Sequence, residues 1–186
     1  MEKTALIPIA DGSEEIEAVT LIDVLRRAGT HVTVASVSDL QITASRGVRI
    51  TADCLLDACI DKTYDLIALP GGMPGAQHLH DNPVLKEMLV RHNGQSRLMA
   101  AICAAPAVVL QAHGILAGRP ATCHPGFNDR LTNQSAIAKP VVVEGNLVTS
   151  QGPGTALAFA LTLVELLYDK TKRRAVAEPM IAAADS

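Results

Sequence analysis

The sequence predicts an α/β protein in which a mostly parallel sheet is covered by helices on both faces, a three-layer α/β/α sandwich. Short apolar runs suited to strands alternate along the chain with longer segments of helical periodicity. Several of these runs lack polar alternation, which is typical of strands buried on both faces. The chain has 186 residues, so we expect a single domain over residues 1–186.

The composition limits the classes of partner. Apolar residues make up 48% of the chain and aromatic residues only 2%, so the core must consist mainly of Ala, Val, Leu and Ile. The formal net charge of -3 gives no electrostatic reason to expect a nucleic acid or an anionic membrane as partner. No basic segment followed by a long apolar run opens the chain, so we expect a cytoplasmic protein with four free cysteines.

The first elements follow from apolar spacing and helix signals. Residues 4–9 read as a buried strand that ends before Asp11-Gly12. Ser13 is the expected cap of a helix with acidic residues in its first turn, and Gly29 is expected to end it. The buried stripe of this helix is Ala18, Leu21, Ile22 and Leu25.

The rest of the chain continues the alternation of strands and helices. We expect strands at residues 31–36, 64–69 and 98–102, with a small hairpin over 39–51 and another over 138–150. A further short strand is expected before Thr122. The predicted helices cover residues 83–92, 105–113, 155–168 and 170–184.

Cys103 is the leading candidate for chemistry because of its position. It directly follows the predicted strand 98–102, and a helix starts within a few residues. Unpaired N–H groups and a helix N-terminus at such a turn favour thiolate over thiol, and the thiolate is the nucleophile. The alternative is a small buried core cysteine.

Three further features are expected at the same edge of the sheet. Glu17 stands between Ile16 and Ala18, which we expect to face inward; beside Cys103 its carboxyl would have a raised pKa and could hydrogen-bond the sulfur or move a proton. A solvated surface glutamate is the alternative. His124 could act as a general base or acid, or be a surface loop histidine. The N–H groups of Gly72 and Ala104 could bind an oxyanion, the alternative for Gly72 being a plain turn.

Cofactor motifs are not apparent in the sequence. The segment 150–155 lacks the third glycine of a dinucleotide fingerprint and the Gly-Lys-Ser/Thr of a phosphate loop. The other histidines show no pattern at metal-ligand spacing. We therefore expect no cofactor and no metal.

Taken together, the motifs resemble the ThiJ/PfpI superfamily, in the branch of the Parkinsonism-associated deglycase. The resemblance runs from about residue 4 to 182. The motifs that carry it are Gly12-Ser-Glu-Glu-Ile-Glu17, Ser45-Arg46, Leu69-Pro-Gly-Gly72, Ala100-Ala-Ile-Cys103-Ala-Ala-Pro106, His124-Pro125 and Thr149-Ser-Gln-Gly-Pro-Gly-Thr155.

The resemblance implies a flavodoxin-like sandwich of the class I glutamine amidotransferase-like type that works as a homodimer. It assigns the nucleophile to Cys103, the hydrogen-bonding carboxyl to Glu17 and a pocket histidine to His124. It assigns the oxyanion-binding backbone to Gly72 and Ala104. Arg46, with Arg27 of the partner subunit, is similar to the family's arginines that approach the pocket across the interface.

The implied activity is of the glyoxalase or deglycase type, without a cofactor, on methylglyoxal or its adducts with protein or nucleotide groups. Protease-like members carry His after the nucleophile, where this chain has Ala104, so we do not expect a peptidase. The alternative is a redox-sensing holdase chaperone whose Cys103 is oxidised to sulfinic acid. A weaker hypothesis is a disulfide between Cys103 and Cys123.

Overall fold

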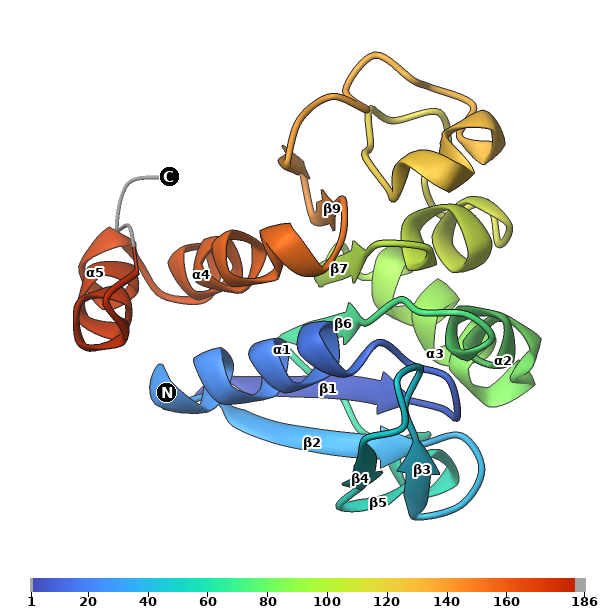
Figure 1. The fold of residues 1–186 in the computed structure, drawn as a ribbon, viewed down its shortest axis with the longest axis horizontal. Helices are drawn as coiled ribbons and strands as arrows, with labels where there is room; N and C mark the ends of the chain where they lie inside the picture. Colours follow the sequence, from blue (N-terminus) through green and yellow to red (C-terminus); the bar gives the residue numbers. More distant parts are fainter. Residues whose placement is uncertain (1, 183–186) are drawn as a thin grey trace.

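A seven-stranded, mostly parallel sheet lies between two layers of helices in the computed structural model, which describes residues 2–182 (Figure 1). The strand order is β5-β2-β1-β6-β7-β9-β8, and every neighbouring pair is parallel except β8 with β9. The strands are β1 (Thr4–Ile9), β2 (His31–Ser36), β5 (Cys54–Leu55), β6 (Leu66–Leu69), β7 (Leu98–Ile102), β8 (Val141–Glu144) and β9 (Leu147–Ser150). The predicted flavodoxin-like α/β/α class is confirmed.

Side chains of β1, which lies inside the sheet between β2 and β6, alternate between two cores. Ile7 and Ile9 pack into a cluster with residues of α1 (Glu15–Arg27) and α4 (Ala156–Leu167), and Leu6 packs into a second cluster with α3 (Pro83–Gly94). Because successive strand residues point to opposite faces, each face of the sheet has its own helical layer. The remaining helical segments are η1 (Leu56–Cys59), α2 (Gly75–Asp81), η2 (Pro106–Gln111), η3 (Pro125–Arg130), η4 (Pro153–Thr155), α5 (Lys170–Ala177) and η5 (Glu178–Met180).

Both predicted hairpins are present. β3 (Gln41–Thr43) pairs with β4 (Arg49–Thr51) in a separate antiparallel sheet, and β8 pairs with β9 around Gly145. The β3–β4 hairpin lies beside the carboxyl end of β1 (Figure 1), where the Gly12 N–H donates to the Thr43 carbonyl at 2.8 Å. This contact brings residues 44–48 to the edge where the site was expected.

Several local expectations are wrong. The helix α2 was not predicted, because its seven residues are too few to show a clear helical period. No strand forms before Thr122; residues 119–124 are irregular there, held by contacts such as the hydrogen bond from the Thr122 N–H to Thr149 Oγ1. The predicted helix 170–184 ends at Ala177 with one further turn, and its last two residues lie outside the described part of the chain.

The start of α1 also differs from the prediction. Glu14, not Ser13, is the residue that caps the helix, with its carboxylate accepting from the Ile16 N–H. The Ser13 hydroxyl accepts instead from the Ala10 N–H at 3.0 Å, which fixes the turn after β1. Ile16 was expected to face inward, yet it is 54% exposed, while Glu17 beside it is fully buried.

None of the helices within residues 2–182 has the length and apolar character needed to cross a membrane.

Candidate active site

Cys103 occupies a tight turn at the carboxyl end of β7, which lies inside the sheet between β6 and β9. Its φ of 64° lies in the left-handed region, which few residues other than glycine adopt. The turn is held on both sides, because the Cys103 N–H donates to the Ser150 carbonyl at 3.0 Å and the Cys103 carbonyl accepts from the His124 N–H at 2.8 Å. Non-glycine residues in such backbone conformations are concentrated at functional sites.

Two backbone N–H groups point at the Cys103 sulfur. They belong to Gly72, after β6, and to Ala104, the next residue in the chain, and both work to lower the pKa of the thiol. The approach of the two loops depends on Gly71, where a Cβ atom would lie 2.6 Å from the Cys103 Cβ. Since real side chains do not approach so closely, only glycine allows this arrangement. The structure therefore places the expected oxyanion-binding N–H pair at the sulfur.

Glu17 extends from α1 into the same buried space. Its side chain is 0% exposed, and Oε2 accepts from the Gly71 N–H at 2.8 Å. The other oxygen, Oε1, has no well-aligned hydrogen-bond partner among residues 2–182. Burial raises the pKa of Glu17 to about 7, against the opposing hydrogen bonds from Gly71 and Cys103. A carboxyl of this kind is protonated in about half of the molecules at neutral pH.

The pKa of Cys103 itself differs from the sequence expectation. Burial, together with the charge of Glu17 and the hydrogen bond to it, raises the pKa of Cys103 to about 12, so the N–H groups alone do not produce a thiolate. Two of these three influences come from the Glu17 carboxylate. They vanish when Glu17 takes up a proton, since a neutral carboxyl neither repels the thiolate nor accepts the thiol proton. The two groups therefore form a pair that holds one negative charge at most near neutral pH.

His124 reaches the pocket from the loop after residue 119. The His124 N–H donates to the Cys103 carbonyl, and the residue is exposed. The ring Nδ1 accepts from the Gly126 N–H at 3.1 Å. The proton of the neutral imidazole is therefore on Nε2, which is the nitrogen left for a substrate.

The pocket in front of Cys103 has a volume of about 240 Å³. Its wall contains two polar residues that the sequence analysis did not assign to the site, Glu14 and Ser45, whose hydroxyl donates to Glu14 Oε2 at 2.7 Å. The only sequence signal for Glu14 was its place in the acidic run, and the helix N-terminus already explained that. The pocket is lined by Glu14, Ser45, Arg46, Gly72, Met73, Cys103, Ala104, His124, Phe127 and Pro153.

The two predicted arginines are placed differently. Arg46 lines the pocket, and its N–H donates to Glu15 Oε1 at 2.9 Å. Burial alone would raise the pKa of Glu15, but hydrogen bonds from the backbone and from Ser45 outweigh it and lower the pKa. Arg27 is not part of this chain's pocket wall; its Nε is bonded to Asp23 at 2.7 Å at the far end of α1.

Cys123 lies in the loop that contacts the Cys103 turn through the His124 N–H, but its sulfur is bonded to other groups. The thiol donates to the His124 carbonyl at 3.4 Å and to Asn128 Oδ1 at 3.5 Å, and burial raises its pKa to about 11. Nothing in its contacts favours the disulfide with Cys103.

Residues 2–182 contain no group of three His, Cys, Asp or Glu side chains arranged to hold a metal ion.

Comparison with known proteins places this geometry in a family. The sequence profile of the DJ-1/PfpI family matches residues 3–166. The solved structure of Toxoplasma gondii DJ-1, oxidized, superposes with a TM-score of 0.95 at 48% identity and covers 97% of this chain and 99% of that one.

Curated relatives agree over nearly the whole chain. Protein DJ-1 homolog B of Arabidopsis thaliana is 49% identical over 90% of this chain, which spans only 38% of that longer protein. Glutathione-independent glyoxalase DJR-1.2 of Caenorhabditis elegans is 39% identical, with 98% of each chain covered. The resemblance found in the motifs is thus confirmed, and the chain belongs to the DJ-1/PfpI family.

Proposed function

We propose that this chain is a cofactor-independent cysteine enzyme of the glyoxalase or deglycase type, acting on methylglyoxal or its adducts. The observation that carries the proposal is the arrangement at one sulfur. Cys103 is held between two N–H groups and a carboxyl with a pKa of about 7, and it faces a pocket of about 240 Å³. The name of the Caenorhabditis elegans relative, a glutathione-independent glyoxalase, supports the same chemistry.

The first step is addition of the Cys103 sulfur to the aldehyde carbon. The reactive form has the proton on Glu17 and the charge on sulfur, which the Gly72 and Ala104 N–H groups stabilise. As the C–S bond forms, negative charge moves to the aldehyde oxygen. The same N–H groups are suited to bind it, and Glu17 can supply its proton to give a hemithioacetal.

The second step is a shift of hydrogen within the bound carbonyl. Glu17, now a carboxylate, takes the proton from the carbon next to sulfur, and the hydroxyl proton on that carbon moves to the neighbouring carbonyl oxygen. Glu17 then returns its proton to the neighbouring carbon, which gives a lactoyl thioester. A pKa near 7 suits a group that must both accept and donate at neutral pH. Water then cleaves the thioester: the Glu17 carboxylate takes the proton of the attacking water, the C–S bond breaks, and lactate and free Cys103 are released. The Nε2–H of His124 is available to donate a hydrogen bond to the substrate oxygens. Methylglyoxal plus water equals lactic acid, so no external oxidant or reductant is needed.

The pocket favours small polar carbonyl compounds. Its volume is below that of most drug-sized sites, so it admits methylglyoxal or the end of one modified side chain. Arg46 in its wall can bind a carbonyl or carboxylate oxygen, because guanidinium groups donate two parallel hydrogen bonds. Peptide hydrolysis is not part of the proposal, because Ala104 replaces the histidine that follows the nucleophile in protease-like members.

The decisive experiment is the Cys103→Ser variant assayed for lactate formation from methylglyoxal. We expect activity to fall to the uncatalysed background, because a neutral hydroxyl is a far weaker nucleophile than a thiolate. Cys54→Ser, which removes a thiol outside the pocket, serves as the matched control and should keep the wild-type rate. Lactate formation that survives in Cys103→Ser would rule out the proposal.

A second candidate function is a redox-sensing holdase chaperone with little turnover. The oxidised state named for the Toxoplasma gondii relative favours it, and the N–H pair at the sulfur is suited to bind sulfinate oxygens. Mass spectrometry after mild peroxide, run beside the lactate assay, separates the two. Selective sulfinate at Cys103 with negligible lactate formation would favour the sensor.

We further propose that the chain acts as a cytoplasmic homodimer. Ile16 and Val19, one helical turn apart on α1, are 54% and 48% exposed, and Val48 of the neighbouring loop is 49% exposed. The Val48 N–H donates to Glu15 Oε1 at 3.5 Å, so the loop that carries Arg46 and Val48 lies against the first turn of α1. We propose that the partner's Arg27 approaches the pocket across this interface.

A further inference from the structure

Two cysteines outside the active site lie in sulfur-to-sulfur contact. Cys54 Sγ and Cys59 Sγ are 3.6 Å apart, and both are free thiols. Cys54 belongs to β5, the strand at one edge of the sheet, and Cys59 to the following turn η1. A disulfide bond is about 2.05 Å long, so the two sulfur atoms need to approach by about 1.5 Å.

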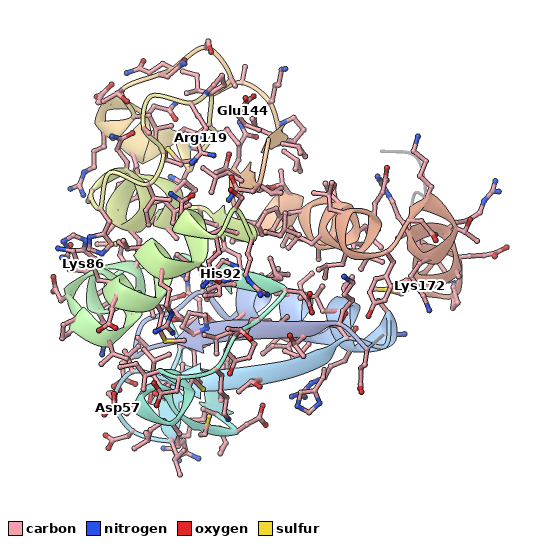
Figure 2. The ribbon with its side chains drawn as sticks, turned by 180° about the vertical axis from the view of Figure 1, so that it is seen from behind. Asp57, Lys86, His92, Arg119, Glu144 and Lys172 are labelled. Atoms are coloured by element: carbon pink, nitrogen blue, oxygen red, sulfur yellow. The ribbon has the colours of Figure 1, made fainter. Side chains whose placement is uncertain are left out.

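The two thiols differ in access to solvent. Cys59 is 0% exposed and packs in the second core cluster, whereas Cys54 is half-buried at the rim of that cluster. The turn between them lies at the edge of the molecule: Figure 2 shows Asp57 of η1 at the opposite end from Glu144 of β8. A dissolved oxidant therefore meets Cys54 first and finds Cys59 directly behind it.

Charged groups of both signs, Lys62 and Asp53, act on Cys54. Burial and the neighbouring Cys59 raise the pKa of Cys54, Lys62 opposes this shift and Asp53 adds to it. Behind Cys59, Tyr64 is buried, and its own pKa is raised by burial and by Cys59. At neutral pH Cys54 is therefore mostly a thiol.

We propose that Cys54 and Cys59 form a second redox site, which hydrogen peroxide closes to an intramolecular disulfide. The Cys54 thiolate attacks one peroxide oxygen, the O–O bond breaks, and the leaving hydroxide takes up the proton released by Cys54. The Cys59 sulfur then attacks the resulting sulfenic acid; the S–O bond breaks, the S–S bond forms, and the Cys59 proton leaves with the hydroxide as water. The two sulfurs lose two electrons, which the peroxide accepts, and two water molecules form.

This site differs chemically from Cys103. The Cys103 sulfur is bonded by the Gly72 and Ala104 N–H groups and by Glu17, none of which can resolve a sulfenic acid as a disulfide. Further oxidation of Cys103 leads to sulfinic acid, which thiols do not reduce. The Cys54–Cys59 pair has its resolving thiol in contact, so its oxidation stops at a disulfide that dithiothreitol reverses.

Mass spectrometry of the full chain tests the proposal directly. Trypsin cleaves after Arg49 and Lys62, so one peptide, residues 50–62, carries both cysteines. After mild hydrogen peroxide and alkylation under denaturing conditions, we expect this peptide unalkylated and lighter by two hydrogen atoms. Dithiothreitol before alkylation should restore the doubly alkylated form.

Variants separate this site from the active site. Cys54→Ser and Cys59→Ser should each abolish the lighter peptide, while Cys123→Ser and Cys103→Ser should keep it, whatever happens to lactate formation. The wild-type measurement decides the matter even if one variant does not fold. The proposal is overturned if residues 50–62 stay fully alkylatable at a peroxide dose that oxidises Cys103, or if Cys54 gains oxygen atoms without forming the disulfide.

The pH dependence gives a second readout. Because Cys54 is far below its pKa at neutral pH, its thiolate fraction rises about tenfold per pH unit. We expect the initial rate of closure to be about tenfold higher at pH 8 than at pH 7. A rate that does not change over this range would show that Cys54 is not the attacking thiol and would also overturn the mechanism.

Discussion

Glu17 and Cys103 share a buried space in which two negative charges would repel each other. Burial raises the pKa of Glu17 to about 7, and burial together with the Glu17 carboxylate raises the pKa of Cys103 to about 12, whereas the hydrogen bond from the Cys103 thiol lowers the pKa of Glu17. The proton on Glu17 and the charge on sulfur are therefore linked. Burial of the ionised Glu17 carboxyl lowers the free energy of unfolding near neutral pH, and this loss of stability can be measured.

We predict that Glu17→Gln removes a pH-dependent loss of stability. The folded pKa of about 7 lies above the unfolded value of 4.5, so the folded state holds the extra proton and loses stability as pH rises between these values. The shift corresponds to roughly 3 kcal/mol, fully developed above about pH 7. Denaturant unfolding at a series of pH values should show Glu17→Gln gaining on the wild type by about this amount from acid to neutral pH.

Glu15→Gln is the contrasting control. The pKa of Glu15 is lowered in the folded chain, so this carboxylate stabilises the fold above its unfolded pKa and loses that effect in acid. Its replacement should destabilise the protein at neutral pH and matter less at low pH. If both variants showed the same pH trend, the explanation from burial of Glu17 would be wrong.

At the scale of elements, the site depends on how closely the loop after β6 approaches the turn after β7. A Cβ at Gly71 would lie 2.8 Å from the Ile102 carbonyl oxygen and 2.9 Å from the Ala104 nitrogen. These atoms belong to backbone that the sheet holds on both sides, so they cannot easily move away. The parallel pairing of β6 with β7 therefore decides the position of both N–H groups at the sulfur.

We predict that Gly71→Ala destabilises the protein by about 1 to 3 kcal/mol, the usual cost of overpacking. It should also slow alkylation of Cys103, since the Gly72 and Ala104 N–H groups move away from the sulfur. Gly94→Ala, at the last residue of α3 with open space around it, is the matched control and should be neutral or slightly stabilising. Unfolding curves and iodoacetamide rates measure both effects. A Gly71→Ala protein with wild-type stability and reactivity would contradict the close approach.

For the whole molecule, the fold places the active-site pocket, the second pair of cysteines and the exposed apolar face of α1 at three separate places. Its carboxyl edge carries the Cys103 pocket, while β5 at one lateral edge carries the Cys54–Cys59 pair. The outer face of α1 presents the exposed Ile16 and Val19. Two apolar side chains one turn apart on a helix are typical of an interface when a polar rim surrounds them.

We predict that Val19→Lys converts the protein to a monomer, because a charge buried in an apolar interface would be unpaired. Val90→Lys, at a 51% exposed position of α3 on the other side of the sheet, is the matched control and should leave the assembly unchanged. Sedimentation or light scattering after gel filtration reports the mass. A wild-type protein that is monomeric at micromolar concentration would end the homodimer proposal.

The sequence by itself predicted the α/β/α class, every strand of the main sheet except β5, most helices, and the position of Cys103 directly after a strand. Unbroken apolar runs mark strands buried on both faces, and Cys103 stands out because it falls between such a run and a helix start. These signals are local, so they survive without knowledge of the fold. The sequence also indicated that Glu17 points toward the site. One premise of that inference was wrong, because Ile16 faces solvent and not the core.

Only the tertiary structure decided which groups meet. Three features depend on how separate segments are placed relative to one another. Glu14 and Ser45 share the pocket wall, position 71 accepts only glycine, and two cysteines five residues apart are in contact. The same holds for the pKa of Cys103: the helix start favours the thiolate, but burial and Glu17 together are stronger. Burial and charge interactions depend on distances in space, and a sequence pattern contains only distances along the chain.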